Sequence, residues 1–351
     1  MASLTSSNKT IDDLSIEHLA QIVSCIDDPL MKMTLRGVSP SFMAAVETST
    51  AWTNIKDVTV TWNGNGGILH LNYRRTRVLY YDDFMWIVDR LLPKLARTER
   101  LKISSTVEQR AETFMQWLHE QLVPSDDFWE LITELLEACP FSELQVAEID
   151  VGKLGIPHDI TFISRSIQRL RFTLDSLIVT ILWSQFGGLE RFADLLKGVR
   201  QTERLHRLTL WISKTWDPKE QIDTDEIYQE MRKNFEGKPL KAFRLKTEFT
   251  PSMKTLLDFL NSLTPGHLQL LHLNMPYGDG FDYLHFWNHL DPDVFRELTE
   301  FEFNLRIQRN QTGEWLRRVP TVCPSLKFLR TDYVNTSPMD AEDLREAISE
   351  W

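Results

Sequence analysis

An apolar pattern of the form Leu-x-x-Leu-x-Leu recurs through much of this 351-residue chain and constrains its fold more than any other feature. Clear copies, some with aromatic residues or Thr at an apolar position, begin at Ile167, Leu205, Leu240, Leu268, Leu298 and Leu326, and weaker ones at Leu101 and Leu144. The last five copies are 35, 28, 30 and 28 residues apart. Alternating apolar residues predict a half-buried strand in each copy, and the interval leaves room for one helix per unit.

Helical patterns fill the intervals between these strands. Apolar residues at helical spacing form one face in each of the segments 84–95, 131–136, 189–196 and 256–263. Neither the strand nor the helix face of a unit is buried unless neighbouring units stack. We therefore predict an α/β fold, an irregular β/α solenoid with parallel strands on its concave side. The right-handed crossover rule then places the helices on the convex side.

A β-hairpin is predicted ahead of the clear repeats. Residues 56–62 and 68–73 alternate between apolar and polar side chains, and the glycine-rich stretch 63–67 between them indicates a turn. The glycines do not match a phosphate-binding loop, because no Lys-Ser or Lys-Thr pair follows them.

The N-terminal segment 13–46 carries more large apolar side chains than short helices can hide against one another. Residues 19–26 place four of them on one helical face. A second helical face follows Pro29, and a third helix is possible after Pro40. Some of these side chains must therefore meet another surface.

The same segment resembles an F-box. The order Leu-x-x-Glu-x-Leu-x-x-Ile-Val-x-x-Ile begins at Leu14, a Met-Thr-Leu-Arg-Gly-Val-Ser run begins at Met33, and Trp52 follows. F-boxes usually have Pro where this chain has Ser15 and Leu where it has Met33. The resemblance implies docking to a Skp-type adaptor and, through it, to a cullin. The residues that it assigns to adaptor binding are Leu14, Ile16, Leu19, Ile22, Val23, Ile26, Leu30, Leu35 and Val38.

The layout of the whole chain resembles nematode-type F-box proteins, in which an F-box precedes a hairpin and an α/β region called FTH. Residues 256–273 look much like the helix, Pro-Gly turn and strand of that region. A generic F-box protein with leucine-rich repeats remains an alternative. Together the patterns and resemblances predict a disordered N-terminus at 1–10, an F-box at 11–53, a β-hairpin linker at 54–81 and a leucine-rich-repeat-like substrate-recognition domain at 82–351.

Composition narrows the classes of partner and compartment. The net charge of −11 argues against a nucleic-acid binder, which needs an excess of Lys and Arg on one surface. The first 13 residues show no signal-peptide pattern, and the longest apolar run, 177–183, is too short to span a membrane. Cys25, Cys139 and Cys323 show no metal-site spacing. We expect reduced thiols in the cytoplasm or nucleus, and no membrane partner.

No constellation of residues predicts catalysis or metal binding. His119 and Glu120 fail the zinc-protease HExxH pattern because residue 123 is Val. The paired acids in 223–225 and 291–293 look like helix N-caps and first-turn carboxylates. We therefore expect no enzymatic activity, no metal and no cofactor.

Two functional hypotheses follow. In the first, the chain is a substrate-recognition subunit of a Skp–cullin–F-box ubiquitin ligase, and its repeat domain binds an unknown target protein, with Trp216 and Tyr277 as candidate contacts. In the second, it is a leucine-rich-repeat-like interaction scaffold unconnected to ubiquitin, and its N-terminal helices only cap the first repeat. A hydrolase on an α/β fold is a third option that no motif supports. An exposed apolar helix face favours the first hypothesis, whereas helices lying flat on the first repeat favour the second.

Overall fold

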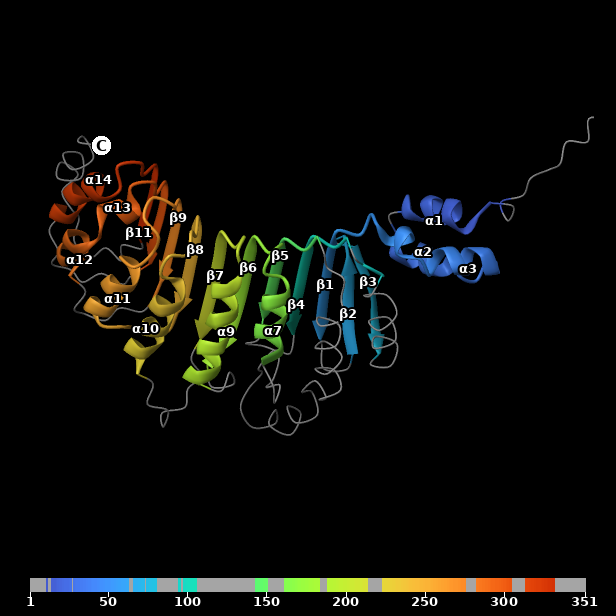
Figure 1. Ribbon diagram of the computed structural model, residues 1–351, viewed down its shortest axis with the longest axis horizontal. Helices are drawn as coiled ribbons and strands as arrows, with labels where there is room; N and C mark the ends of the chain where they lie inside the picture. Colours follow the sequence, from blue (N-terminus) through green and yellow to red (C-terminus); the bar gives the residue numbers. More distant parts are fainter. Residues whose placement is uncertain are drawn as a thin grey trace, which may run out of the picture. The chain divides into compact units, whose positions relative to one another are not determined.

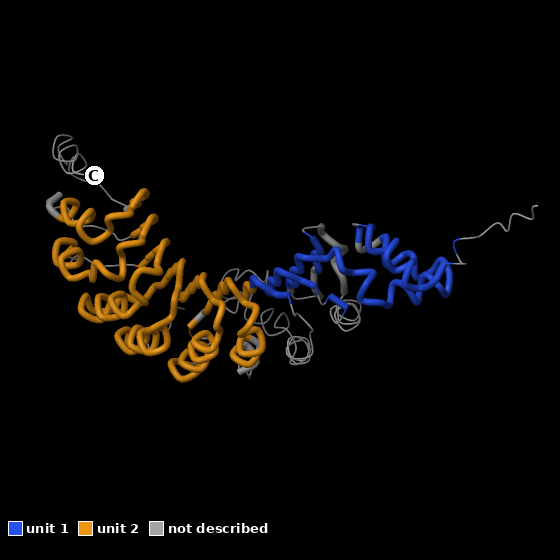
Figure 2. Tube along the Cα trace, turned by 45° about the horizontal axis from the view of Figure 1, so that its top comes forward, with its two compact units in different colours: residues 1–146 blue, residues 147–351 orange. Residues whose placement is uncertain are grey.

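The computed structural model describes residues 11, 14–26, 28–62, 66–72, 74–80, 94–95, 97–105, 143–150, 161–183, 188–213, 223–275, 282–304 and 313–331. The chain divides into two compact units, residues 1–146 and 147–351 (Figure 2). The first unit holds the N-terminal helices together with the hairpin, and most of the clear repeats lie in the second.

The first unit begins with three short helices and a 3-10 turn, which are α1 (Ile16–Ser24), α2 (Pro29–Leu35), α3 (Pro40–Val46) and η2 (Ser49–Trp52). Ser15 and Ser39 cap α1 and α3, because their hydroxyls accept hydrogen bonds from the backbone amides of His18 and Phe42. Ser15 therefore has a structural role at the start of α1. The helices share an apolar core made of Leu19, Ala20, Val23, Phe42, Ala45, Val46, Ala51 and Trp52.

A buried lysine ties the chain after η2 to the second helix. Lys32 is fully buried, and its ammonium donates to the carbonyl of Ala51 at 2.6 Å and to the side-chain oxygen of Asn54. The Asn54 amide in turn donates to the carbonyl of Ile26 at 3.1 Å. Because an unpaired buried ammonium would be costly, these bonds help to define how the helices pack.

The rest of the first unit contains β1 (Asp57–Trp62), β2 (Gly66–Leu71), β3 (Arg74–Tyr80) and β4 (Arg100–Ser105), in the spatial order β4-β1-β2-β3 (Figure 1). The predicted hairpin is present as the antiparallel pair of β1 and β2, and β3 extends it. However, β1 also pairs in parallel with β4. The segment predicted as a linker therefore supplies the first strand of the parallel repeat.

The second unit continues the alternation of strands and helices. Its elements, with β5 at the boundary, are β5 (Val146–Asp150), α7 (Thr161–Arg169), β6 (Ser176–Leu182), α9 (Leu189–Gln201), β7 (Arg207–Ser213), α10 (Thr224–Phe235), β8 (Ala242–Thr247), α11 (Met253–Leu260), β9 (Leu270–Asn274), α12 (Tyr283–His289), α13 (Pro292–Phe295), β10 (Glu300–Asn304), η5 (Gly313–Arg318), α14 (Val319–Val322) and β11 (Phe328–Thr331). Strands β6 to β11 follow one another in chain order, and each pairs in parallel with the next. Figure 2 shows this unit as an arc with its helices along the outside and its strands along the inside. The predicted α/β solenoid is therefore the architecture of the second unit.

Aromatic side chains fill much of the space between the helices and the sheet. The ring of Phe243 on β8 lies 5.7 Å from that of Phe259 on α11, and the ring of Trp287 on α12 lies 5.4 Å from that of Phe301 on β10. Such edge-to-face ring pairs stabilise the packing beyond what burial of their apolar area contributes. The predicted helical faces in 189–196 and 256–263 belong to α9 and to α11 with the turn after it. Those in 84–95 and 131–136 lie almost wholly outside the described residues.

One hydrogen-bond arrangement recurs at the start of successive strands. The backbone carbonyl of Asp175 accepts bonds from the amides of both His206 and Arg207, each at 3.0 Å. The same arrangement, in which one carbonyl accepts two successive amides of the next repeat, occurs at the carbonyls of Lys56, Glu99, His206, Lys241, Gln269 and Thr299. In the four clear copies that begin at Leu205, Leu240, Leu268 and Leu298, this carbonyl follows directly after the first Leu of the pattern. That Leu thus precedes its strand.

The structure corrects the predicted repeat copy at Ile167. This residue lies in α7, and the turn after the helix leaves Phe172 49% exposed. The strand copy begins instead at Leu174 and continues through Leu177 and Val179 in β6, all three of them fully buried. The prediction failed because an amphipathic helix and this strand pattern both place apolar residues three positions apart.

At β1, a side chain takes the place of the recurring carbonyl. The side-chain oxygen of Asn72 accepts hydrogen bonds from the successive amides of Lys56 at 2.8 Å and Asp57 at 3.2 Å. Its amide group donates to the carbonyl of Asn54 at 2.8 Å. Asn72 has a positive φ of 50°, a conformation that Asn tolerates better than most residues. Asn72 therefore completes the hydrogen bonding of the first parallel strand.

We expect Asn72→Ala to lower the free energy of unfolding of the first unit by roughly 1–3 kcal/mol, because two amides lose their acceptor. Urea denaturation measures the loss, and hydrogen exchange of the Lys56 and Asp57 amides locates it. The control, Asn274→Ala on β9, changes an Asn of the second unit and should leave both amides protected. Unchanged protection of the two amides in Asn72→Ala would contradict the assigned role.

Candidate binding surfaces

The N-terminal helices bury a shared core and still expose large apolar side chains. The exposed fractions run from 39% for Leu14 to 60% for Val38. The other members of this set, which we call the apolar helix surface, are Ile11, Ile16, Ile22, Met31 and Met43. Exposed apolar side chains in this number on a short module are typical of a surface that binds another protein.

The residues predicted to bind an adaptor divide into three groups. Leu14, Ile16, Ile22 and Val38 are exposed on the apolar helix surface, and Ile26 and Leu35 are half-buried. Leu19 and Val23 are fully buried in the core of the helices, so they stabilise the module instead of offering a surface. The side chain of Leu30 lies outside the described residues.

The second unit presents one face of its sheet without a covering layer of described helices. Along β7 and β8, alternate residues are buried toward the helices, and those between them are wholly or partly exposed. We call the side of β6–β11 that faces away from the helices the open face. The strand register aligns its side chains into rows. The central row is Ile178, Thr209, Arg244, His272, Glu302 and Arg330, and the next is Thr180, Trp211, Lys246 and Asn274.

An aromatic ring and two cations lie together on β7 and β8. Trp211 is 42% exposed, and the ammonium of Lys246 lies 3.6 Å from the centre of one of its rings. This distance is well within the range of a cation–π interaction. Arg244, two residues before Lys246 on the same strand, is also exposed on the open face. The site therefore combines positive charge with an accessible aromatic surface.

A histidine and a glutamate occupy the adjacent strands. The Nδ1 atom of His272 lies 3.6 Å from one carboxylate oxygen of Glu302, and a guanidinium nitrogen of Arg330 lies 3.4 Å from the other. The Nε2 atom of His272 is buried and has no hydrogen-bond partner among the described residues. Burial lowers the pKa of His272, an effect that Glu302 opposes and that Arg244 reinforces.

The predicted target contacts, Trp216 and Tyr277, lie outside the described residues. The residues predicted from the sequence follow strands, whereas the open-face residues lie within strands. Their signal was present in the repeat itself, since Arg244, His272 and Glu302 all stand between the second and third apolar positions of their copies. Those positions point away from the helices in every such strand.

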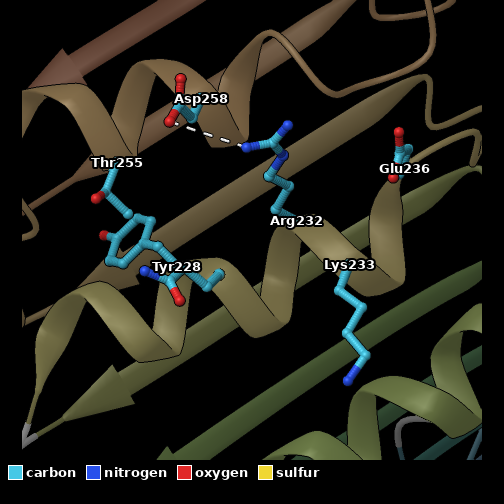
Figure 3. A pocket seen from close by; sticks show the side chains of 7 residues that line it. Tyr228, Arg232, Lys233, Glu236, Thr255 and Asp258 are labelled. Atoms are coloured by element: carbon cyan, nitrogen blue, oxygen red, sulfur yellow. Dashed lines mark ion pairs between the residues drawn. The ribbon is translucent and has the colours of Figure 1, made fainter.

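A groove of about 420 Å³ lies between α10 and α11 on the helix side of the second unit (Figure 3). Tyr228, Arg232 and Lys233 line it from α10, and Thr255 and Asp258 from α11. Arg232 and Asp258 face each other across it, with a guanidinium nitrogen 3.9 Å from a carboxylate oxygen. Because these two charges compensate each other, the groove is a weaker candidate for a ligand-binding site than the open face.

The described part of the chain contains no cluster of three or more His, Cys, Asp or Glu side chains arranged to hold a metal ion. Within the same residues, no helix has the length and apolar character needed to cross a membrane. Asp223 and Asp291 cap α10 and α13, as the sequence predicts for these acid pairs.

Comparison with known proteins places few limits on function. No family model matches the chain, and no curated protein matches it. Among solved structures, the chain is similar to the leucine-rich repeat-containing protein LegL7 from Legionella pneumophila, with 15% sequence identity and a TM-score of 0.42. The similarity covers 77% of this chain and 78% of that one. The repeat is therefore defined by the strand register and hydrogen bonds described above.

The half-buried His272 predicts a pH dependence of stability. The unfolded chain binds a proton at this imidazole near its ordinary pKa of 6.5, whereas the folded chain binds it only at lower pH, so protonation favours unfolding. We expect the free energy of unfolding to fall as the pH drops below about 6.5, and His272→Gln to remove part of that fall. Urea denaturation at several pH values measures it. The control is His267→Gln, which removes an exposed imidazole. If the free energy of unfolding depends on pH in the same way in His272→Gln and in wild type, the prediction is contradicted.

Proposed function

We propose that this protein is the substrate-recognition subunit of a Skp–cullin–F-box ubiquitin ligase. The observation that carries the proposal is the apolar helix surface, which is exposed although the helices beneath it already have a core of their own. The second part of the proposal is that the open face of the repeat unit binds the target protein.

The physical case for adaptor docking rests on the cost of exposed apolar side chains. Each large aliphatic side chain moved from water into an interface contributes roughly 1.5–3 kcal/mol, and a few buried anchors supply most of the affinity in typical interfaces. Ile16 and Ile22 on α1 and Val38 between α2 and α3 are suited to this role because folding leaves them in water. These three residues lie in the N-terminal segment whose sequence resembles an F-box.

The alternative scaffold function would have the N-terminal helices lie flat on the first repeat as a cap. Within the first unit, Figures 1 and 2 show α1–α3 beside the hairpin of β1–β3 instead of over the face of its sheet. The apolar helix surface also has no covering element among the described residues. Both observations favour docking of a separate protein over intramolecular capping.

In the proposed function this chain catalyses nothing itself. It would hold the target near a recruited ubiquitin-conjugating enzyme, and its contribution to the rate would be proximity and orientation. No cofactor is needed for that role. The cytoplasm and the nucleus are the compartments in which we expect it to act, with Cys25 and Cys323 as free thiols.

We expect Ile16→Asp with Ile22→Asp to lower the amount of co-purified Skp-type adaptor by at least about tenfold, because two charged groups would have to be buried in an apolar interface. Both residues are exposed, so the unfolding midpoint should stay near the wild-type value. Phe172→Asp is the matched control, since Phe172 is a similarly exposed apolar residue in the second unit.

The outcomes separate the two hypotheses. A double variant that binds the adaptor as strongly as wild type contradicts docking through α1. A folded wild-type protein that binds no adaptor contradicts the ligase function and leaves the scaffold hypothesis. Leu19→Ala is unsuitable as a docking test, because loss of this fully buried side chain should itself cost about 2–5 kcal/mol of stability.

A further inference from the structure

Strand β8 places two positively charged side chains on the open face, although the chain as a whole is acidic. Arg244 and Lys246 both point to this face, and neither makes an ion pair with any residue that the structure describes. The net charge of the chain is −11, so excess positive charge at one place is not a consequence of composition. Uncompensated cations on an exposed surface attract an anionic ligand.

Two acidic residues in this part of the sheet have other partners. Glu302 lies between His272 and Arg330. Asp175, before β6, is 2.8 Å from the imidazole of His206. These acids therefore do not neutralise Arg244 and Lys246 directly, and the positive charge of β8 remains available to a ligand.

The spacing of the cations indicates the shape of that ligand. Side chains two residues apart on one strand are separated by roughly 6.5–7 Å, which is also the spacing of alternate side chains in an extended peptide. An extended segment with acidic residues at alternate positions would place successive carboxylates on Arg244 and Lys246. Trp211, beside Lys246 on β7, would supply an aromatic surface for the rest of that segment.

We propose that the open face over β7–β9 binds an extended acidic segment of a partner protein, with its carboxylates on Arg244 and Lys246 and its backbone or apolar atoms on Trp211. This inference rests on the proposed role of the open face in target binding and names the chemistry of the target. We choose an acidic segment as the ligand because its negative charges complement the positive charges of Arg244 and Lys246. A nucleic acid fits less well, because a tight complex with it requires neutralisation of many phosphates.

The test uses the full-length protein and a fluorescein-labelled peptide of four Glu-Ser repeats, with binding followed by fluorescence anisotropy. A peptide of four Gly-Ser repeats is the neutral comparison, and an oligothymidylate of eight nucleotides is the nucleic-acid comparison. We expect the acidic peptide to bind at least about tenfold more tightly than either, with an affinity that falls as salt rises.

Variants then locate the site. Arg244→Gln with Lys246→Gln should weaken binding of the acidic peptide by about tenfold or more, since charged partners at an interface are lost. The matched control is Arg204→Gln with Lys254→Gln, which changes the net charge equally at exposed residues of a turn and of α11. Trp211→Ala should weaken binding several-fold, and Trp211→Phe should recover most of that loss.

Three results would overturn the inference: equal binding of the neutral peptide, equal loss of affinity in the control variant, or tighter binding of the oligothymidylate. Adaptor co-purification, measured on the same proteins, keeps this result separate from the proposed function. Loss of peptide binding with the adaptor still bound removes the acidic-target inference alone. Loss of adaptor binding with the peptide still bound removes the ligase proposal alone.

Discussion

A carbonyl shared by two amides recurs just before successive strands, and the rest of the repeat depends on this constraint. A backbone oxygen has two lone pairs and can accept two amides, and here seven such carbonyls each accept two successive amides of the next repeat. This junction fixes the register of neighbouring strands before the strands themselves begin. Copies 28 to 35 residues apart can therefore stack in one sheet, because the variable length lies in the helical connections and not at the junction.

The same register creates the candidate binding site on the open face. Trp211, Arg244 and His272 come from three different repeats, but the parallel pairing places Trp211 opposite Lys246 and Arg244 opposite His272. Positions that alternate with the buried ones face away from the helices in every strand. A ligand on the open face therefore contacts residues that are tens of positions apart in the sequence, and the repeat can change its specificity at these positions without changing its core.

Local periodicity predicted the alternation of strands and helices, the hairpin and the three N-terminal helices, because each is encoded by neighbouring residues. It failed where two structures share one pattern. Ile167 fitted a strand copy but lies in α7, and Leu19 and Val23 fitted a docking face but form the core of the helices. Which face of an amphipathic element is buried depends on its partners. The sequence also offered no means to choose Trp211 over Trp216, since exposure depends on strand register.

The two candidate surfaces can change independently. The core beneath the apolar helix surface is built from residues 19–52, and Lys32 and Asn54 complete its hydrogen bonds within the same unit. The open face over β7–β9 belongs wholly to the second unit and depends on its own register. A substitution at Ile16 therefore should not disturb Arg244, and one at Arg244 should not disturb the helices. The proposed function makes use of this separation, because target specificity could then change while adaptor binding is retained.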